Sequence, residues 1–566
     1  MTLFALKKTW YDRGVNFLEN EKARINMKRR FIAGTLAFAL LFTNGCGKSE
    51  TVMLVNEADK EEVSAEVPGW QKYASEPVTL DWYINYSWFV TGWGNNLVSQ
   101  KITEDTGVTV NFIVPKGSEQ EKLNSLISTD TLPDIITLGW WESAVNEMVS
   151  KDMVCALNEL ADQYDPYFYQ VADKTVLDWN TTSDGNVYMY PCSSTTPQDL
   201  KSKNIASNQT FLVRKDIYEA IGSPDMTTVE GFSQAVRKAK EMFPEVDGEP
   251  LIPIGAHEFD DIGCTSFDSY LMNYLRVPFE KDGVYYDRHT DEEYLRWLKA
   301  FRQLGQEGYL SDCIFVDNRT QMSEKIEKGQ YFCMLYQRTD MADQQKILYN
   351  NNPDSIYIAV EGPRNSKGEE PVLPVNTING WTVTLISKNC KNPDRAIAFM
   401  EYLISEKGQK LISIGIEGET YDVVDGQYVI KPEVEALLYT DRRAYDMTYG
   451  ADNAYWMLQN NVMQSEWMPK AQDPLLQMEE WTYKYATYLG QYEIYVKEES
   501  EAGIAKHQIE LLWSKTLPQL LLAESDERFD EILAEFVEKR ADLGFDMLIE
   551  EETRQVEENK KRLGLE

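Results

Sequence analysis

Short segments of alternating or continuous apolar residues recur along the chain and predict β-strands. Residues 78–84 read Val-Thr-Leu-Asp-Trp-Tyr-Ile, and residues 108–113 have the same β-rich composition. Residues 135–138 form a short apolar run that is typical of a buried strand. Further predicted strands lie at residues 211–213, 331–336 and 381–386.

Segments with a helical period separate these strands. Residues 97–106 are predicted to form a helix that ends at Gly107. Thr227 and Glu230 have the spacing of a capping box, which predicts a helix from there to about Met242. Because strands and helices alternate, the pattern predicts an α/β fold with mostly parallel strands.

Two later segments show a one-sided apolar pattern. Asn392 and Pro393 predict the start of a helix, as N-cap and first-turn residues. The apolar positions that follow are Ala396, Phe399, Met400, Leu403 and Ile404. The same spacing recurs from Phe529 to Val537, so roughly the last 70 residues are predicted to be helical.

The N-terminal region has the pattern of a secretory signal. Residues 27–45 contain the basic triplet Lys28-Arg29-Arg30 and then an apolar run that is too short to span a membrane. We expect residues 1–26 to be a mis-called extension upstream of a true start at Met27. Residues 46–77 are polar and are predicted to be a flexible linker.

The junction Gly45-Cys46 resembles the lipobox of bacterial lipoproteins, although Thr43 stands where that pattern prefers Leu. The resemblance implies that a lipid such as palmitate on Cys46 holds the protein at the extracellular face of the cell membrane. The alternative is ordinary cleavage followed by free secretion.

Size and charge narrow the class of protein. A chain of 566 residues is too long for one core and predicts two or more domains. The net charge of −36 excludes nucleic acid as a partner, because phosphates require Lys and Arg. We expect a monomer.

Catalytic and metal-binding chemistry has little support. The three histidines are far apart, and the seven cysteines form no C-x-x-C pair. Asp178, Asn180, Thr182 and Asp184 alternate like calcium ligands, but the glycine falls at the wrong position. No nucleophile elbow, H-E-x-x-H or P-loop is present, so we expect no enzyme, no metal and no cofactor.

Aromatic and polar side chains follow several predicted strands. The candidates are Asn85, Tyr86, Trp88, Trp93, Trp140, Trp141 and Arg338. Open α/β sheets bind ligands at the carboxyl ends of their strands, and sugars suit aromatic faces edged by polar groups. The alternative for any single Trp is core packing. Arg338 or Arg214 could instead hold an acidic ligand, and for Arg214 a structural salt bridge is the expected role.

Several segments resemble the large sugar-binding lipoproteins of Gram-positive ABC importers, which are extracellular solute-binding proteins. The matching segments are Leu132–Ile136, Ser183–Pro191, Leu212–Asp216, Asn392–Ala396, Gly415–Gly418, Trp513–Pro518 and Ser525–Glu527. Together they extend over about residues 78–566.

This resemblance implies a type II periplasmic-binding-protein-like fold of two discontinuous lobes with extra C-terminal helices. The first lobe would comprise residues 78–190 and about 380–435, and the second about 191–379 and 436–566. The chain would cross between lobes near Tyr188–Pro191 and Asn379–Trp381. Tyr188, Tyr190 and Trp381 therefore join the candidate ligand-binding residues.

The expected function is the extracytoplasmic binding component of an ABC transporter. It would capture a sugar or oligosaccharide between the lobes and deliver it to the membrane permease subunits. One alternative is a peptide- or signal-binding lipoprotein of the same fold. Another is a secreted carbohydrate-active enzyme such as a glycosidase.

Overall fold

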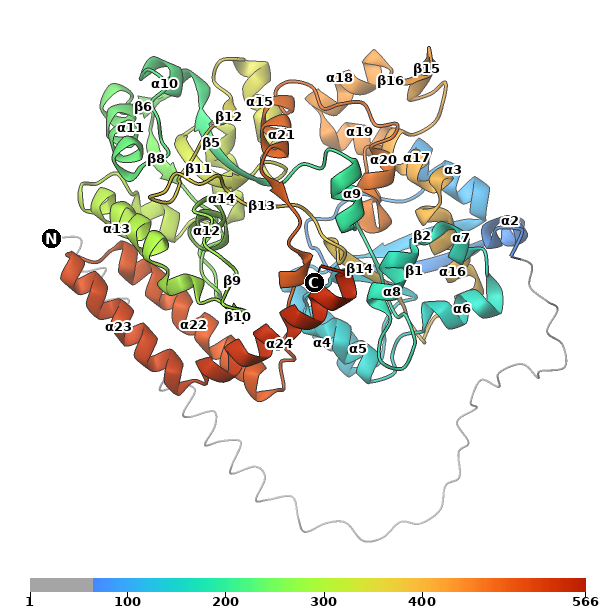
Figure 1. Ribbon diagram of the computed structural model, residues 1–566. Coiled ribbons are helices and arrows are strands. Elements are labelled where there is room, and N and C mark those ends of the chain that lie inside the picture. Colours follow the sequence, from blue (N-terminus) through green and yellow to red (C-terminus); the bar gives the residue numbers. More distant parts are fainter. Residues whose placement is uncertain (1–64, 566) are drawn as a thin grey trace, which may run out of the picture. The chain divides into compact units, whose positions relative to one another are not determined.

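The computed structural model describes residues 65–565, which contain two mixed β-sheets flanked by helices (Figure 1). The signal, the lipid-anchor cysteine and most of the predicted linker lie outside the described residues. The first sheet has five strands in the order β2-β1-β3-β14-β4. Its strands are β1 (Val78–Ile84), β2 (Val108–Ile113), β3 (Ile135–Gly139), β4 (Tyr190–Pro191) and β14 (Thr382–Ile386).

The second sheet has four strands in the order β12-β5-β11-β8. Its strands are β5 (Gln209–Arg214), β8 (Ile252–Gly255), β11 (Tyr331–Gln337) and β12 (Tyr357–Ala359). Four small two-stranded sheets complete the β-structure of the described residues. They pair β6 (Glu245–Val246) with β7 (Glu249–Pro250), β9 (Glu280–Lys281) with β10 (Val284–Tyr285), β13 (Leu373–Pro374) with β17 (Ala486–Thr487), and β15 (Tyr421–Val424) with β16 (Gln427–Ile430).

The six predicted strands all form, but the expectation of mostly parallel sheets was wrong. In the first sheet β1 is parallel to β2 and β3, whereas β14 is antiparallel to both β3 and β4. In the second sheet only β8 and β11 are parallel. The physical reason is that β14 returns to the first sheet from the other half of the molecule and so enters it in the opposite direction.

The helices of the first half include the buried helix α16, which packs against α2, α6, α7 and α17. They are α2 (Gly69–Tyr73), α3 (Leu97–Thr106), α4 (Glu119–Ser128), α5 (Ser143–Ser150), α6 (Leu157–Tyr164), α7 (Phe168–Val171), α8 (Lys174–Asn180), α16 (Pro393–Ile404), α17 (Glu406–Ile414), α18 (Pro432–Thr440), α19 (Arg442–Thr448) and α20 (Asn461–Gln464). The predicted boundaries of α3 are confirmed, including its end at the left-handed Gly107. Pro393 begins α16 as expected, although the Asn392 side chain makes no capping hydrogen bond.

The helices of the second half include the predicted C-terminal group. They are α10 (Lys215–Ala220), α11 (Val229–Met242), α12 (Leu271–Tyr274), α13 (Glu292–Gln306), α14 (Arg319–Glu327), α15 (Ala342–Asn351), α21 (Leu476–Tyr483), α22 (Glu501–Leu521), α23 (Asp526–Asp542) and α24 (Phe545–Leu563). Figure 1 shows α22 beside α13, and α22, α23 and α24 pack against one another. The capping box at Thr227 was wrong, because Thr228 caps α11 while Thr227 bonds Asp225.

Each sheet has its own hydrophobic core, so we call the two halves the first and second lobes. The first core joins Trp82, Phe399 and Met400, and it extends to Tyr445 and Trp456. The second core joins the strands of the second sheet to α11, α13 and the C-terminal helices. Aromatic side chains of residues 436–458 also belong to the first core.

The chain passes between the lobes through three segments. The first links β4 to β5 and contains α9 (Pro197–Ser202), and the second links β12 to β14. The third runs from α20 to α21. Gly380 lies where the second segment meets the first, with φ of 63°, and a Cβ there would lie 1.9 Å from the Cys192 carbonyl oxygen. A glycine is therefore needed for the two segments to approach this closely.

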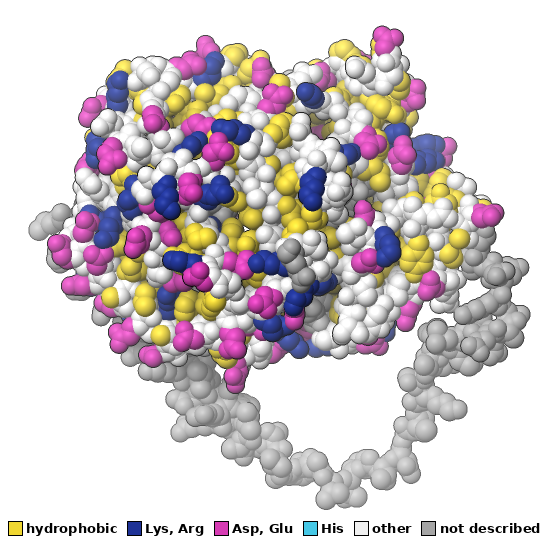
Figure 2. Space-filling model, in the orientation of Figure 1, with side chains coloured by type: hydrophobic (Ala, Val, Ile, Leu, Met, Phe, Trp, Pro, Cys, Tyr) yellow, Lys and Arg dark blue, Asp and Glu magenta, His cyan; other side chains and the backbone are white. Residues whose placement is uncertain are grey.

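The surface carries charges of both signs. On the face shown in Figure 2, Lys and Arg are interspersed with Asp and Glu over both lobes. No helix within residues 65–565 combines the length and the apolar character that a bilayer crossing requires.

Candidate ligand-binding site

Four aromatic rings meet where β1 ends and β14 begins, and we call them the aromatic platform. Tyr86 and Trp88 follow β1, and Trp381 directly precedes β14. The fourth ring, Trp456, comes from a short 3-10 helix at Trp456–Leu458. Three separate parts of the chain thus build one cluster, and two of them adjoin β1 and β14, which lie on either side of β3 in the first sheet.

The rings of the platform lie one over another. The Trp88 ring stacks on Trp381 with centroids 6.1 Å apart and planes 14° apart, and on Trp456 at 5.7 Å. Trp381 and Trp456 lie 4.5 Å apart, and Tyr86 contacts all three. Trp456 is 8% exposed, whereas Trp88 is 54% exposed. The buried rings therefore support Trp88, which presents a large apolar surface to solvent.

Two buried polar atoms in the platform have no hydrogen-bond partner within residues 65–565. They are the Tyr86 hydroxyl and the Trp456 indole nitrogen. Burial raises the pKa of Tyr86, and the carboxylates of Glu142 and Glu119 raise it further. Tyr86 is therefore a neutral donor at physiological pH. A bound hydroxyl group could satisfy such atoms, since unpaired buried polar groups are costly.

A polar network adjoins the platform. The Asn85 side chain accepts from the Tyr83 hydroxyl at 2.8 Å and donates to Glu142 Oε2 at 2.7 Å. The other oxygen of Glu142 accepts the Gly139 N–H at 2.8 Å. Both ends of the Asn85 amide are thus engaged, so it orients Glu142.

Trp93 and the two tyrosines near the first crossing, Tyr188 and Tyr190, occupy other surroundings. Trp93 packs against Phe112, Phe399 and Tyr455, and its indole donates to Thr103. Tyr190 is 7% exposed in the first core.

The Tyr188 hydroxyl donates to Asp184 at 2.8 Å within a local turn. Within the described residues, no ring contact joins Trp93, Tyr188 or Tyr190 to a ring of the platform.

Trp140 and Trp141 form a separate pair after β3. Their rings meet edge to face at 6.0 Å, and Trp141 is 50% exposed. A Cβ on Gly139 would lie 2.7 Å from the Trp141 ring, so the glycine allows this ring to pack on the backbone. The pair is a second aromatic surface at the same edge of the first sheet.

In the second lobe, the arginine after β11 has structural partners. Arg338 donates to the Ser207 carbonyl at 2.9 Å and pairs with Glu479 at 3.3 Å. Arg214 is buried and pairs with Asp216 at 3.0 Å, as expected. Arg319 pairs with Asp340 at the end of the same sheet.

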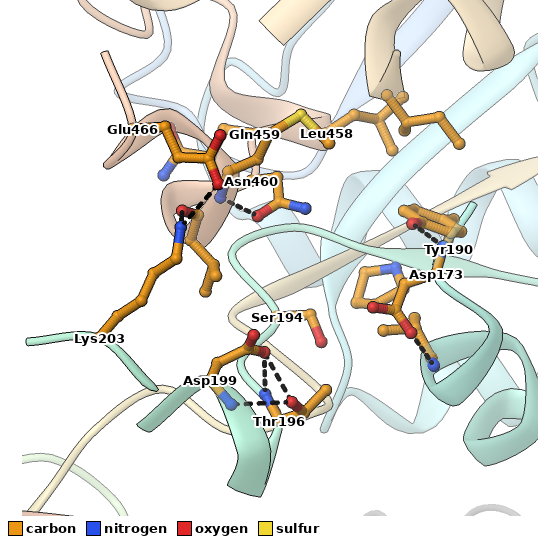
Figure 3. A pocket seen from close by; sticks show the side chains of 15 residues that line it. Asp173, Tyr190, Ser194, Thr196, Asp199, Lys203, Leu458, Gln459, Asn460 and Glu466 are labelled. Atoms are coloured by element: carbon orange, nitrogen blue, oxygen red, sulfur yellow. Dashed lines mark hydrogen bonds and ion pairs between the residues drawn. The ribbon is translucent and has the colours of Figure 1, made fainter. Parts of the chain in front are cut away.

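A cavity of about 280 Å³ lies beside the first crossing segment. Figure 3 shows Tyr190 and Asp173 on one side of it and Lys203 reaching toward Glu466 on the other. Lys203 and Glu466 form an ion pair at 3.1 Å, and Thr196 and Asp199 form a capping box at the start of α9. The cavity is bordered by the first crossing segment and by α20.

The described residues hold no group of three His, Cys, Asp or Glu side chains that could bind a metal ion. The six cysteines of this part of the chain are free thiols, four of them buried. Burial raises the pKa of Cys192 to about 11, so this thiol is unreactive at neutral pH.

Sequence reasoning missed Trp456, Glu119 and Glu142. Trp456 follows no predicted strand, and its partners lie far away in the sequence. The two glutamates are among 92 acidic residues and carry no motif. For Glu142, its position directly after Trp141 was a usable signal.

The family described as bacterial extracellular solute-binding protein matches residues 98–417. Among curated proteins, lipoprotein LipO of Bacillus subtilis is 19% identical over 443 residues, which cover 74% of this chain and 78% of that protein.

Solved structures share the fold. The alginate-binding protein AlgQ2 superposes with a TM-score of 0.62 at 16% identity, covering 86% of this chain and 99% of that one. The Streptococcus pneumoniae protein FusA, an ABC-transporter substrate-binding protein in complex with kestose, gives 0.61 at 14% identity, covering 86% and 100%. A human-milk-oligosaccharide (HMO)-binding solute-binding protein of Bifidobacterium longum infantis gives 0.61 at 13%, covering 85% and 99%. The predicted two-lobed α/β fold is thereby confirmed.

Proposed function

The chain belongs to the family of bacterial extracellular solute-binding proteins, and from this premise we propose that it captures a sugar or oligosaccharide for an ABC importer. It would release this ligand to the permease subunits in the membrane. The proteins that it resembles in family and fold are binding proteins, and we propose that it has no catalytic activity of its own.

The observation that carries this proposal is the aromatic platform. Trp88 offers an exposed ring backed by Trp381 and Trp456, which suits the C–H face of a sugar. Hydroxyl groups at the sugar edge would reach the polar network at Asn85 and Glu142. The platform stands at the strand ends of an open α/β sheet, where such folds bind ligands.

These contacts support some of the candidate site residues more strongly than others. Tyr86, Trp88 and Trp381 are proposed to contact the sugar, with Asn85 orienting Glu142. Trp140 and Trp141 could extend the surface for a longer chain. Trp93, Tyr188, Tyr190 and Arg338 have the packing, turn or ion-pair partners described above, so we propose supporting roles for them.

Calorimetry on residues 47–566 with neutral oligosaccharides and with peptides of similar size tests the proposal. We expect at least one oligosaccharide to bind with micromolar or tighter affinity and without release of reducing ends. We expect no heat of binding with the peptides. Binding of peptides alone would favour the alternative of a peptide or signal receptor. Reproducible cleavage of a bound glycan would contradict a pure binding role.

The location is proposed to be the outer face of the cell membrane, with the lipid on Cys46. A lipoprotein relative and an extracellular family support it. Replacing Cys46→Ser should release the protein into the medium or stall its processing, as measured by cell fractionation. A Cys46→Ser protein that is cleaved normally and stays in the membrane would contradict the anchor.

A further inference from the structure

Two carboxylates are held by the residues that flank Tyr86 in the platform. Glu142 Oε2 accepts the Asn85 amide at 2.7 Å. Glu119 Oε1 accepts the Ser87 backbone N–H at 2.6 Å. Asn85 and Ser87 are the immediate neighbours of Tyr86, so both negative charges lie close to the exposed stacking ring of Trp88.

These carboxylates influence one another and the platform. Burial raises the pKa of Glu142, the Gly139 N–H and the Asn85 amide oppose this rise, and Glu119 adds to it. Both carboxylates also add to the rise in the pKa of Tyr86 that burial causes. The negative potential therefore reaches the rings that would contact a ligand.

The arginines at the strand ends of the second sheet are already paired with carboxylates. Arg338 pairs with Glu479 at 3.3 Å, and Arg319 pairs with Asp340. Lys116 is an exposed cation in the loop before Glu119. Water screens the charge of an exposed lysine, whereas Glu142 is partly buried and screened less. Lys116 therefore cannot offset the two carboxylates.

We propose that this site accepts uncharged oligosaccharides and rejects sugars that carry carboxylates, such as uronates. The inference rests on the proposed function, because it presupposes that the platform binds a sugar. It separates this chain from the alginate-binding protein that shares its fold, since the ligand in that protein's name is a polyuronate.

The physical basis is a difference in how the two ligand classes meet Glu119 and Glu142. Each oxygen of a carboxylate can accept more than one hydrogen bond, so neutral sugar hydroxyls can donate to those that remain open. A uronate would bring a third negative charge into the same space, and the arginines at the strand ends of the second sheet, Arg338 and Arg319, already have carboxylate partners. Discrimination by repulsion is a common route to specificity.

Calorimetry with two sets of probes tests the inference. The neutral set is maltotriose, cellotriose, mannotriose and kestose, and the acidic set is trigalacturonate and trimannuronate. We expect at least one neutral probe to bind and each uronate to bind at least tenfold more weakly than the best neutral probe. Raising the salt from 20 to 200 mM should reduce this gap, because screening weakens the repulsion.

Four variants assign the effect to its source. Glu142→Gln and Glu119→Gln each remove one charge while keeping the acceptor oxygen, so each should strengthen uronate binding severalfold relative to neutral binding. Glu121→Gln is the matched control, since it makes the same change at an exposed position on α4 and should leave the ratio unaltered. Lys116→Ala should widen the gap by less than twofold.

The outcomes separate this inference from the proposed function. A uronate that binds as tightly as the best neutral probe overturns the inference and leaves the sugar-binding function intact. The inference is also overturned if neither Glu142→Gln nor Glu119→Gln changes the ratio of uronate affinity to neutral-sugar affinity. If no probe of either set and no glycan on a broad array binds, the proposed function fails and the inference fails with it.

Discussion

The tryptophans of this protein differ in what surrounds each ring. Trp88 is 54% exposed on top of the platform, whereas Trp456 is 8% exposed beneath it. Trp93 has its indole nitrogen bonded to Thr103 and its ring among three other aromatic rings. Residue type alone therefore does not separate a ligand-contacting ring from a structural ring, and exposure and ring partners do.

Truncating the exposed ring should mainly reduce affinity, whereas truncating the buried ring should mainly reduce stability. Trp88→Ala should weaken sugar binding about tenfold or more while shifting Tm little, since a stacked ring contributes roughly 1–3 kcal/mol. Trp456→Ala should lower the free energy of unfolding by about 3–5 kcal/mol through the cavity it leaves. Calorimetry and thermal unfolding on both variants provide the check. If Trp88→Ala loses stability in proportion to affinity, the ring is structural.

A second prediction at the residue scale concerns Gly380. Gly380→Ala should cost about 2–4 kcal/mol, because it adds left-handed strain and places a Cβ against the Cys192 carbonyl. Gly426→Ala is the matched control, since that glycine also has positive φ but has nothing within 4 Å of its Cβ position. Denaturant unfolding should show a cost of only about 1 kcal/mol for the control. Equal costs for the two variants would show that the close approach at Gly380 is unimportant.

At the scale of elements, one side chain joins three segments at the second crossing. Asn379 accepts from the Trp179 indole on α8 at 2.6 Å and donates to Glu493 at 2.8 Å. Arg562, near the end of α24, lies 4.0 Å from the Trp179 ring and donates to its carbonyl. The crossing segment and the C-terminal helix are therefore both connected to the first lobe through Trp179.

Removing this junction should loosen the arrangement of the lobes. Asn379→Ala leaves the Trp179 indole and Glu493 without their partner, which should cost about 1–3 kcal/mol and change the radius of gyration of the ligand-free protein. Asn379→Asp is the matched variant, because it keeps an acceptor for Trp179 but removes the amide that donates to Glu493. Small-angle scattering and thermal unfolding measure both effects. An unchanged radius of gyration in both variants would contradict a role of Asn379 in holding the arrangement of the lobes.

At the scale of the whole molecule, several buried carboxyl groups favour the protonated form. Burial raises the pKa of Glu401 to about 8 and that of Glu493 to about 7. It also raises the pKa of Glu552 to about 7 and those of Asp165 and Asp268 to about 6. Asp165 adds to the rise at Glu401, so these two groups titrate together.

These groups predict that the protein is more stable at mildly acidic pH. A carboxyl group with a raised folded-state pKa binds its proton more tightly in the folded state than in the unfolded state. Its contribution is therefore complete below the unfolded pKa, which is 4.5 for Glu and 3.8 for Asp, and is lost as pH rises through the folded pKa. Tm should rise by several degrees between pH 8 and pH 5.5. Glu401→Gln should flatten this dependence, and an unchanged slope would contradict the assignment.

The sequence by itself determined the elements and the class of protein. Local patterns were sufficient for α3, for the start of α16 and for six strands of the two sheets, because period and capping residues act over a few positions. The short strands β4, β8 and β12 were not predicted. The ordered motifs were sufficient for the family. The same patterns placed Trp88 after β1, at the edge where open sheets bind ligands.

Only the tertiary structure decided which of these residues meet. Trp456 lies 368 positions from Trp88 in the chain, yet their rings stack at 5.7 Å because β14 and the 3-10 helix return to the first sheet. The return of β14 also makes the first sheet mixed, and Trp93 packs against the first core. Such contacts depend on long-range packing of the whole lobe, and no pattern within a few residues encodes that packing.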